Sequence, residues 1–96
     1  MMRKTTKNLI TTNETFLTMT KATKIDQQIG KKIAIYRKLR NKTQFWLAEK
    51  VKISYQQIQN YERGKNRVAA SRLLEISKIL KTPIINFFPN NKDESL

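Results

Sequence analysis

Apolar residues recur at intervals of three and four positions along much of the chain, as they do on the buried face of an α-helix. The first stripe lies in residues 26–40, where Asp26 is placed to cap a helix that ends near Arg40. We expect its inward-facing residues to be Ile29, Ile33, Tyr36 and Leu39. Asn41 follows, and asparagine tolerates the left-handed backbone that often ends a helix.

Two shorter stripes follow, and they predict two helices joined by a tight turn. The helices are expected over residues 44–51 and 55–63, each preceded by a residue suited to cap it, Thr43 and Ser54. Their apolar residues are Leu47, Ala48, Val51, Ile58 and Tyr61. Lys52 occupies the turn, where a positive φ is expected despite the cost of about 1 kcal/mol relative to glycine.

Two further helices complete the pattern after Gly64, which is suited to a positive φ at the end of the preceding helix. The fourth helix is expected over residues 70–80, and its apolar residues are Leu73, Ile76, Ile79 and Leu80. Pro83 suits the first turn of a short fifth helix that runs to Phe88, and Pro89 stops it. No segment alternates as a strand does, so the pattern predicts an all-α fold of five helices.

Charge and composition divide the 96 residues into three parts. Residues 1–24 are rich in threonine and basic residues, and we interpret them as a flexible basic tail. An arm that follows DNA, or a true start at Met19, remains open for this segment. Residues 25–89 form the helical domain and hold most of the net charge of +13, while residues 90–96 are a short polar end. The charge indicates a polyanionic partner, either nucleic acid or an anionic membrane surface.

Several classes of function are excluded by the composition. The chain contains neither cysteine nor histidine, so disulfides, thiolate chemistry and Cys/His metal sites are ruled out. No apolar run approaches the ~20 residues that a membrane span needs, and no signal-peptide pattern is found, so we expect a cytoplasmic protein. Because the sequence has no nucleophile–base pair, carboxylate pair or phosphate-binding glycine loop, we expect no enzymatic activity, no cofactor and no metal.

The polar face of the helix expected over residues 55–63 is rich in amides. Its residues are Tyr55, Gln56, Gln57, Gln59 and Asn60. An amide places a donor beside an acceptor, which matches the N6/N7 edge of adenine in a major groove. In a strongly basic helix-turn-helix, we interpret this face as a DNA-reading surface rather than as a solvated one. Tyr55, Gln56, Gln57 and Asn60 are expected to read bases, with Gln56 deepest and with Gln57 and Gln59 turned more to the sides.

The segment from Ile29 to Phe88 resembles the helix-turn-helix domain of phage Cro and cI-type repressors, the xenobiotic-response-element-like family. The residues that carry the resemblance are Arg37, Thr43-Gln44, Leu47-Ala48, Ile53-Ser54, Ile58, Glu62-Arg63-Gly64 and Leu80. Residues 55–67 look especially similar to a branch of alphaproteobacterial regulators. The resemblance implies a five-helix, lambda-repressor-like domain that binds double-stranded DNA with its third helix in the major groove.

The resemblance also implies roles for the residues around the reading helix. Contacts to DNA phosphates, which hold register without reading sequence, are expected from Gln44, Ser54, Arg63, Lys65, Asn66 and Arg67. Arg37 and Glu62 are expected to form a buried structural ion pair. Phe45 and Trp46 depart from the family pattern, which usually has polar residues at these positions. We expect Phe45 to cover an edge of the core, and Trp46 has no assigned role.

Two classes of function fit these features. The first is a sequence-specific transcriptional regulator, expected to be a repressor. The second is an antitoxin-type interaction protein that neutralises a partner and represses its own operon. A membrane-surface protein fits less well, because the helices lack a strongly cationic amphipathic face.

A homodimer on a palindromic operator is expected, because one small module buries little surface on DNA. The self-contact is placed in the region of the fourth and fifth helices. Ile85 and Phe87 are expected at the interface, with Ile84 and Phe88 in the core. The competing arrangement buries all four side chains in the core of one monomer.

Overall fold

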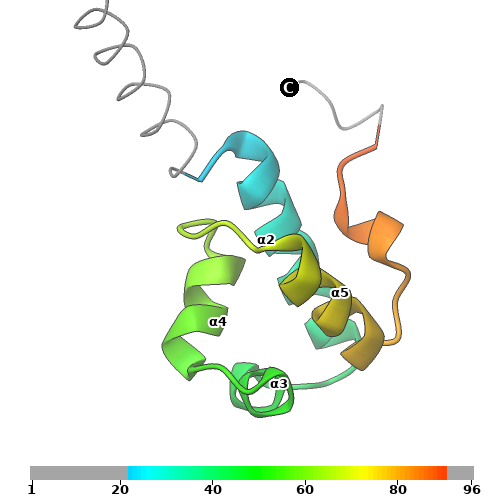
Figure 1. Cartoon of the computed structure of the whole chain (residues 1–96). Coiled ribbons are helices and arrows are strands. Elements are labelled where there is room, and N and C mark those ends of the chain that lie inside the picture. Colours follow the sequence, from blue (N-terminus) through cyan, green and yellow to red (C-terminus); the bar gives the residue numbers. More distant parts are fainter. Residues whose placement is uncertain (1–21, 91–96) are drawn as a thin grey trace, which may run out of the picture.

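The computed structural model describes residues 22–90, which form a helical domain without strands in this range (Figure 1). Its elements are the α-helices α2 (Lys24–Leu39), α3 (Gln44–Val51), α4 (Tyr55–Glu62) and α5 (Ala70–Ile79) and the 3₁₀ helix η1 (Ile84–Phe87). The interpretations of the N-terminal tail and of the last six residues fall on residues 1–21 and 91–96, outside the described part. The expected all-α class is confirmed for the described residues.

Helix α2 begins three residues before the position expected from the sequence. Thr23, not Asp26, is its N-cap, and the two side chains form a reciprocal capping box. The Thr23 hydroxyl oxygen accepts a bond from the Asp26 backbone N–H at 3.2 Å, and Asp26 Oδ2 accepts one from the Thr23 backbone N–H at 2.7 Å. The box satisfies two free backbone donors, whereas Asp26 acting alone as the cap would satisfy one.

The buried stripe of α2 is narrower than expected. Ile29 and Ile33 are buried and Tyr36 is half-buried, but Leu39 is largely exposed, so its predicted place in the core is wrong. At 3.6 residues per turn, Leu39 points about 120° away from Ile33. The helix ends as expected, because Asn41 adopts a positive φ of 58°.

Helices α2 and α4 cross closely in the core. A Cβ atom added at Gly30 would overlap the backbone carbonyl oxygen of Tyr61, so this crossing requires a residue without a side chain. Helix α3 packs against α4 and α5, and η1 packs against α2 and α5. The core that results contains residues from all five elements, including Ile33, Leu47 and Ile58.

The fifth helix is a 3₁₀ helix rather than an α-helix, and this changes which aromatic residue is buried. Phe87 is fully buried and meets the ring of Tyr36 edge-on at 5.1 Å, while Phe88 is 40% and Ile85 70% exposed. The prediction that Phe87 lies at an interface and Phe88 in the core is therefore wrong. A 3₁₀ helix aligns residues three apart, which places Phe87 beside Ile84; an α-helix would have paired Ile84 with Phe88.

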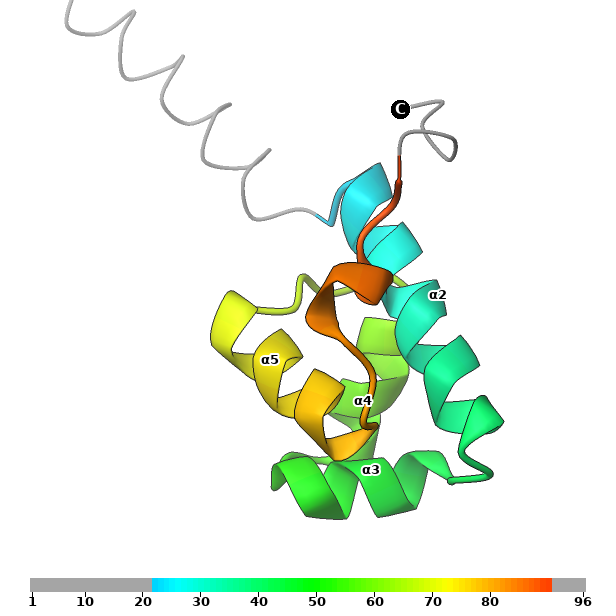
Figure 2. The same ribbon diagram turned by 90° about the vertical axis from the view of Figure 1, so that its right-hand side faces the viewer.

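Helix α4 and η1 lie on opposite sides of the domain. In Figure 1 α4 is on the left and η1 on the right, and in Figure 2 η1 is in front with α4 behind it. The expected reading helix and the expected region of self-contact are therefore on different faces, so one can be occupied while the other remains open.

Candidate nucleic-acid interface

Helices α3 and α4 are joined by a tight turn whose geometry follows from local residues. The hydroxyls of Thr43 and Ser54 cap the two helices by accepting bonds from the backbone N–H groups of Trp46 and Gln57, each at 3.0 Å. Between them Lys52 adopts the left-handed conformation with φ of 63°. Both predicted caps and the predicted positive φ are confirmed, and the turn tolerates a lysine where glycine would be easier.

Two amides of α4 are free to meet a ligand. Gln56 is the exposed residue of this helix, and Asn60 lies one turn further along the same side. Within the described residues, no hydrogen bond engages either side-chain amide. Their donors and acceptors are therefore available to an outside partner.

The other polar residues of this face are engaged inside the domain. Gln57 Oε1 accepts a bond from the Asn66 amide at 3.3 Å, which ties α4 to the loop after it. The Gln59 amide donates to the Tyr55 hydroxyl at 3.0 Å. Tyr55 and Gln57 were both expected to read bases, and the structure gives each an internal contact as well. The sequence did not reveal these pairs, because each depends on side-chain directions that the pattern leaves open.

Arg37 and Glu62 form a buried two-point ion pair between α2 and α4. Arg37 Nε and Nη2 donate to the two carboxylate oxygens at 2.7 and 3.0 Å, and the side chains are only 9% and 6% exposed. Arg37 Nη1 also donates to the Lys42 carbonyl, and the Gln44 amide donates to Glu62 Oε1 at 2.8 Å. Three donors thus converge on the Glu62 carboxylate, so its charge is compensated beside a surface expected to meet phosphates.

The six expected phosphate-binding residues are not equivalent in the structure. The Gln44 side chain bonds to Glu62, and its backbone N–H, at the first position of α3, has no acceptor within the helix. Ser54 uses its oxygen as a cap acceptor and keeps its hydroxyl proton to donate. Arg63 and Lys65 are exposed around the end of α4, and Asn66 is half-buried against Gln57.

Arg67 lies in an ion pair that the sequence did not predict. Its Nε donates to Asp26 Oδ2 at 3.0 Å, so the loop after α4 is joined to the start of α2. Burial alone would raise the pKa of Asp26, but bonds from the Thr23 backbone, from Arg67 and from the Thr23 hydroxyl outweigh it and lower the pKa below its usual value. The Arg67 side chain remains 41% exposed, so the pair is partly solvated.

Phe45 and Trp46, adjacent in α3, point in directions about 100° apart and have different surroundings. Phe45 does not cover the core as expected: it is 67% exposed and stacks in parallel on the ring of Tyr55, with the centroids 4.1 Å apart. Trp46 is half-buried against the core, and the ammonium groups of Lys42 and Lys50 lie 4.7 and 5.7 Å from the centre of its ring. An aromatic pair of exposed Phe45 and half-buried Tyr55 therefore lies at the start of α4, next to Gln56.

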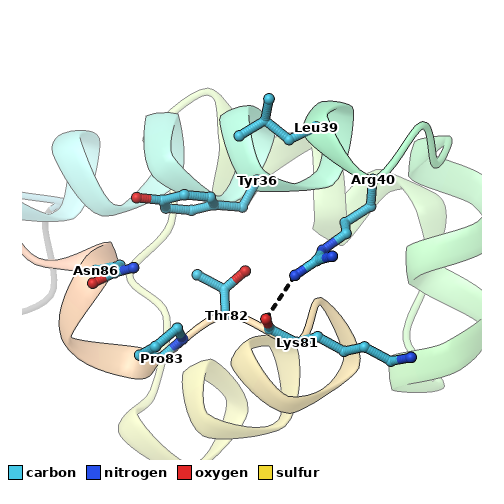
Figure 3. Close-up of a pocket in the computed structure, with 7 residues that line it drawn as sticks. All are labelled: Tyr36, Leu39, Arg40, Lys81, Thr82, Pro83 and Asn86. Atoms are coloured by element: carbon cyan, nitrogen blue, oxygen red, sulfur yellow. Dashed lines mark hydrogen bonds between the residues drawn. The ribbon is translucent and has the colours of Figure 1, made fainter.

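A shallow hollow lies on the side of the domain away from α4, between the end of α2 and the connection from α5 to η1 (Figure 3). Its lining residues are Tyr36, Leu39, Arg40, Lys81, Thr82, Pro83 and Asn86. Arg40 Nε and Nη2 donate to the carbonyls of Leu80 and Lys81 at 2.8 and 2.7 Å, which fastens α2 to the end of α5.

The residues that the structure describes include no helix long and apolar enough to cross a membrane.

Comparison with known proteins agrees with this geometry. Residues 33–86 match the family model described as helix-turn-helix, which covers more than half of the chain. The chain belongs to this family of Cro/cI-type transcriptional regulators. Relatives include an uncharacterized HTH-type transcriptional regulator of Sinorhizobium medicae, 47% identical over 64 residues, and a transcriptional regulator in the ATPase CF(0) region of Rhodospirillum rubrum, 44% identical over 64 residues.

The relatives are longer than the shared region. Each alignment covers 67% of this chain but only 46% of the Sinorhizobium protein and 59% of the Rhodospirillum protein, so the chain spans about half the length of the curated relatives it matches. Further relatives come from Sinorhizobium fredii and Rickettsia. The expected similarity to alphaproteobacterial regulators is confirmed.

Solved structures share the fold. The clp gene regulator ClgR of Corynebacterium glutamicum superposes with a TM-score of 0.64 at 21% identity, covering 66% of this chain and 82% of that one. The restriction-modification controller protein C.AhdI of Aeromonas hydrophila gives a TM-score of 0.61 at 19% identity, covering 65% and 94%. At these identities the likeness shows the fold alone.

Proposed function

We propose that this chain binds double-stranded DNA in a sequence-specific manner through α4 and represses transcription from the bound site. The observation that carries the proposal is the pair of free amides, Gln56 and Asn60, on the outward side of a capped helix. A major groove admits one α-helix, and an amide can bond to both N6 and N7 of adenine. A repressor acts by occupying its operator, and binding of α4 in the major groove is sufficient for that.

The charges around α4 support the same proposal. Glu62, the acidic residue of α4, is compensated by Arg37 and Gln44 and therefore repels a phosphate only weakly. Exposed Arg63 and Lys65 flank the end of the helix, and the N-terminus of α3 offers free backbone N–H groups. The exposed cations and the start of α3, whose Gln44 bonds to Glu62, thus both lie toward the C-terminal end of α4, where the backbone of a bound duplex would run.

Salt dependence of DNA binding tests the proposal. If about five phosphates are neutralised, log K is expected to fall with log salt at a slope of roughly −4 to −5. Lys65→Ala is expected to reduce the slope by about one and to weaken all sequences alike. Lys31→Ala, which removes an exposed lysine of α2, is the matched control and leaves the slope unchanged. A nearly flat salt dependence of the parent protein would exclude DNA binding.

A homodimer on a palindromic operator is part of the proposal. Because Phe87 is buried, the self-contact must use other residues, and Ile85 and Phe88 are the exposed apolar side chains of the η1 segment. This segment does not overlap α4, so a self-contact there leaves the reading helix of each copy uncovered (Figures 1 and 2). Two copies would double the base contacts and read half-sites ~34–36 Å apart.

The antitoxin alternative finds no support among the relatives. The relatives described above are named as transcriptional regulators, and no contact in the described residues singles out a surface for a toxin partner.

A further inference from the structure

Phe45 is an exposed aromatic residue on an otherwise polar and basic face. The residue is 67% exposed, and its ring lies parallel to that of Tyr55, with an interplanar angle of 7° and a centroid distance of 4.1 Å. Phe45 is the second residue of α3, and Tyr55 is the first residue of α4. The stack therefore joins the beginnings of the two helices of the helix-turn-helix, beside the free amide of Gln56.

The stack is held from a second side by a hydrogen bond. Gln59 donates its amide to the Tyr55 hydroxyl at 3.0 Å, so that hydroxyl already serves as an acceptor. The Tyr55 ring is thus fixed by Phe45 on one face and by Gln59 at its tip, and Phe45 gains a rigid support. The outer surface of Phe45 remains open to an apolar partner.

DNA offers one apolar group in the major groove, the C5-methyl of thymine. The methyl lies on the side of the pyrimidine nearest its own sugar, close to the wall of the groove. In this fold the reading helix enters the groove while the preceding helix crosses the backbone. Phe45 is in the first turn of α3 and stacks on Tyr55, the first residue of α4. Its side chain is therefore expected to lie between the major groove and the DNA backbone. Aromatic contact with the thymine methyl is a recognised mode of base reading.

We infer that the Phe45–Tyr55 stack is a thymine-reading element, in which the exposed ring of Phe45 packs against the C5-methyl of one thymine at the edge of each half-site. The inference rests on the proposed DNA binding through α4. It adds an apolar specificity contact from α3 to the amide contacts of α4. It also explains why an aromatic residue stands exposed at the second position of α3, at a place that packing in the core does not require.

The test uses duplexes recovered from random sequence by selection with the parent protein. In the recovered operator each thymine is replaced, one at a time, by deoxyuridine, which lacks the methyl and keeps every hydrogen-bonding group. The parent protein is expected to lose about fourfold in affinity at one thymine per half-site, since burial of one methyl-sized group is worth about 0.8 kcal/mol. Phe45→Ala is expected to bind the thymine and deoxyuridine duplexes equally well, and Phe45→Leu to keep part of the difference.

Two controls separate this contact from simpler effects. Ile35→Ala truncates an exposed apolar residue of α2 and is expected to keep the full sensitivity to the methyl. Thermal unfolding of Phe45→Ala is expected to match the parent closely, because the side chain is mostly exposed.

The outcomes distinguish the inference from the proposed function. If no operator is recovered and binding is insensitive to salt, the proposed DNA binding fails. If an operator is bound but no thymine-to-deoxyuridine change matters, or if Phe45→Ala weakens both duplexes while the methyl effect persists, the inference alone is overturned. In that last case Phe45 only positions Tyr55.

Discussion

The Glu62 carboxylate accepts three side-chain hydrogen bonds, since Arg37 bonds to both of its oxygens and Gln44 to one. Removing it would leave Arg37 with an uncompensated charge in a buried setting. We predict that Glu62→Ala lowers the free energy of unfolding by about 3–5 kcal/mol, measured by urea denaturation. Glu49→Ala, at an exposed position of α3, is the control and is expected to change it by less than about 0.5 kcal/mol.

The same variant separates a structural role of Glu62 from a role in DNA contact. A Glu62→Ala protein that unfolds at the same urea concentration as the parent but binds DNA far more weakly would make Glu62 a contact residue. The ion pair would then contribute little to the fold.

Single residues show where sequence reasoning reaches its limit. The Arg37–Glu62 pair was expected only because the chain resembles a known family, since the two residues lie 25 positions apart. The Arg67–Asp26 pair joins residues 41 positions apart, and neither the sequence pattern nor the family resemblance indicated it. Phe45 was expected to cover an edge of the core, but it stacks on Tyr55 instead, and this contact depends on where two helix starts meet. Apolar character alone does not specify which surface an apolar side chain will face.

At the scale of elements, the start of α2 depends on an ionised carboxylate. Asp26 has a pKa below its usual value, because bonds from Thr23 and Arg67 outweigh the effect of burial. Since the folded pKa is depressed, the stabilisation is fully present above the unfolded value of about 3.9 and is lost as the pH falls through the folded value. We predict that the difference in unfolding free energy between the parent and Asp26→Asn shrinks as the pH is lowered from 6 to 3.

Urea unfolding of both proteins across this range measures that difference. Other carboxylates also become protonated, but they do so in both proteins and cancel in the comparison. A difference that stays constant down to pH 3 would show that the charge of Asp26 contributes nothing to the capping box and to the contact with Arg67.

The starts of two helices were predicted correctly, whereas the cap of α2 and the residue that η1 buries were not. Helices α3 and α4 begin where Thr43 and Ser54 predict, because a cap depends on residues within one turn. The type of η1 depends instead on how it packs against α2 and α5. A short segment can close as a 3₁₀ or an α-helix at little difference in energy, so tertiary contacts decided that Phe87 rather than Phe88 is buried.

At the scale of the whole molecule, the separation of α4 from η1 predicts that dimerisation and base reading can be altered independently. We predict that Ile85→Lys converts a 2:1 complex on palindromic DNA into a 1:1 complex, measured by sedimentation, because a charge would be placed in the apolar contact. Ile35→Lys adds the same charge at another exposed apolar position and is expected to keep the 2:1 complex. A parent complex that is already 1:1 and unchanged by Ile85→Lys would exclude this dimer.

The most direct test of α4 as the reading helix compares Gln56→Ala with the parent protein on two duplexes, the selected operator and a random sequence of equal length. Gln56 is the exposed residue of α4 and has no internal hydrogen bond in the described domain. We predict that the variant loses about 1–3 kcal/mol of binding free energy on the operator, confined to one base pair of each half-site, and binds the random duplex like the parent. Equal losses on both duplexes, or no loss on either, would contradict base reading by α4.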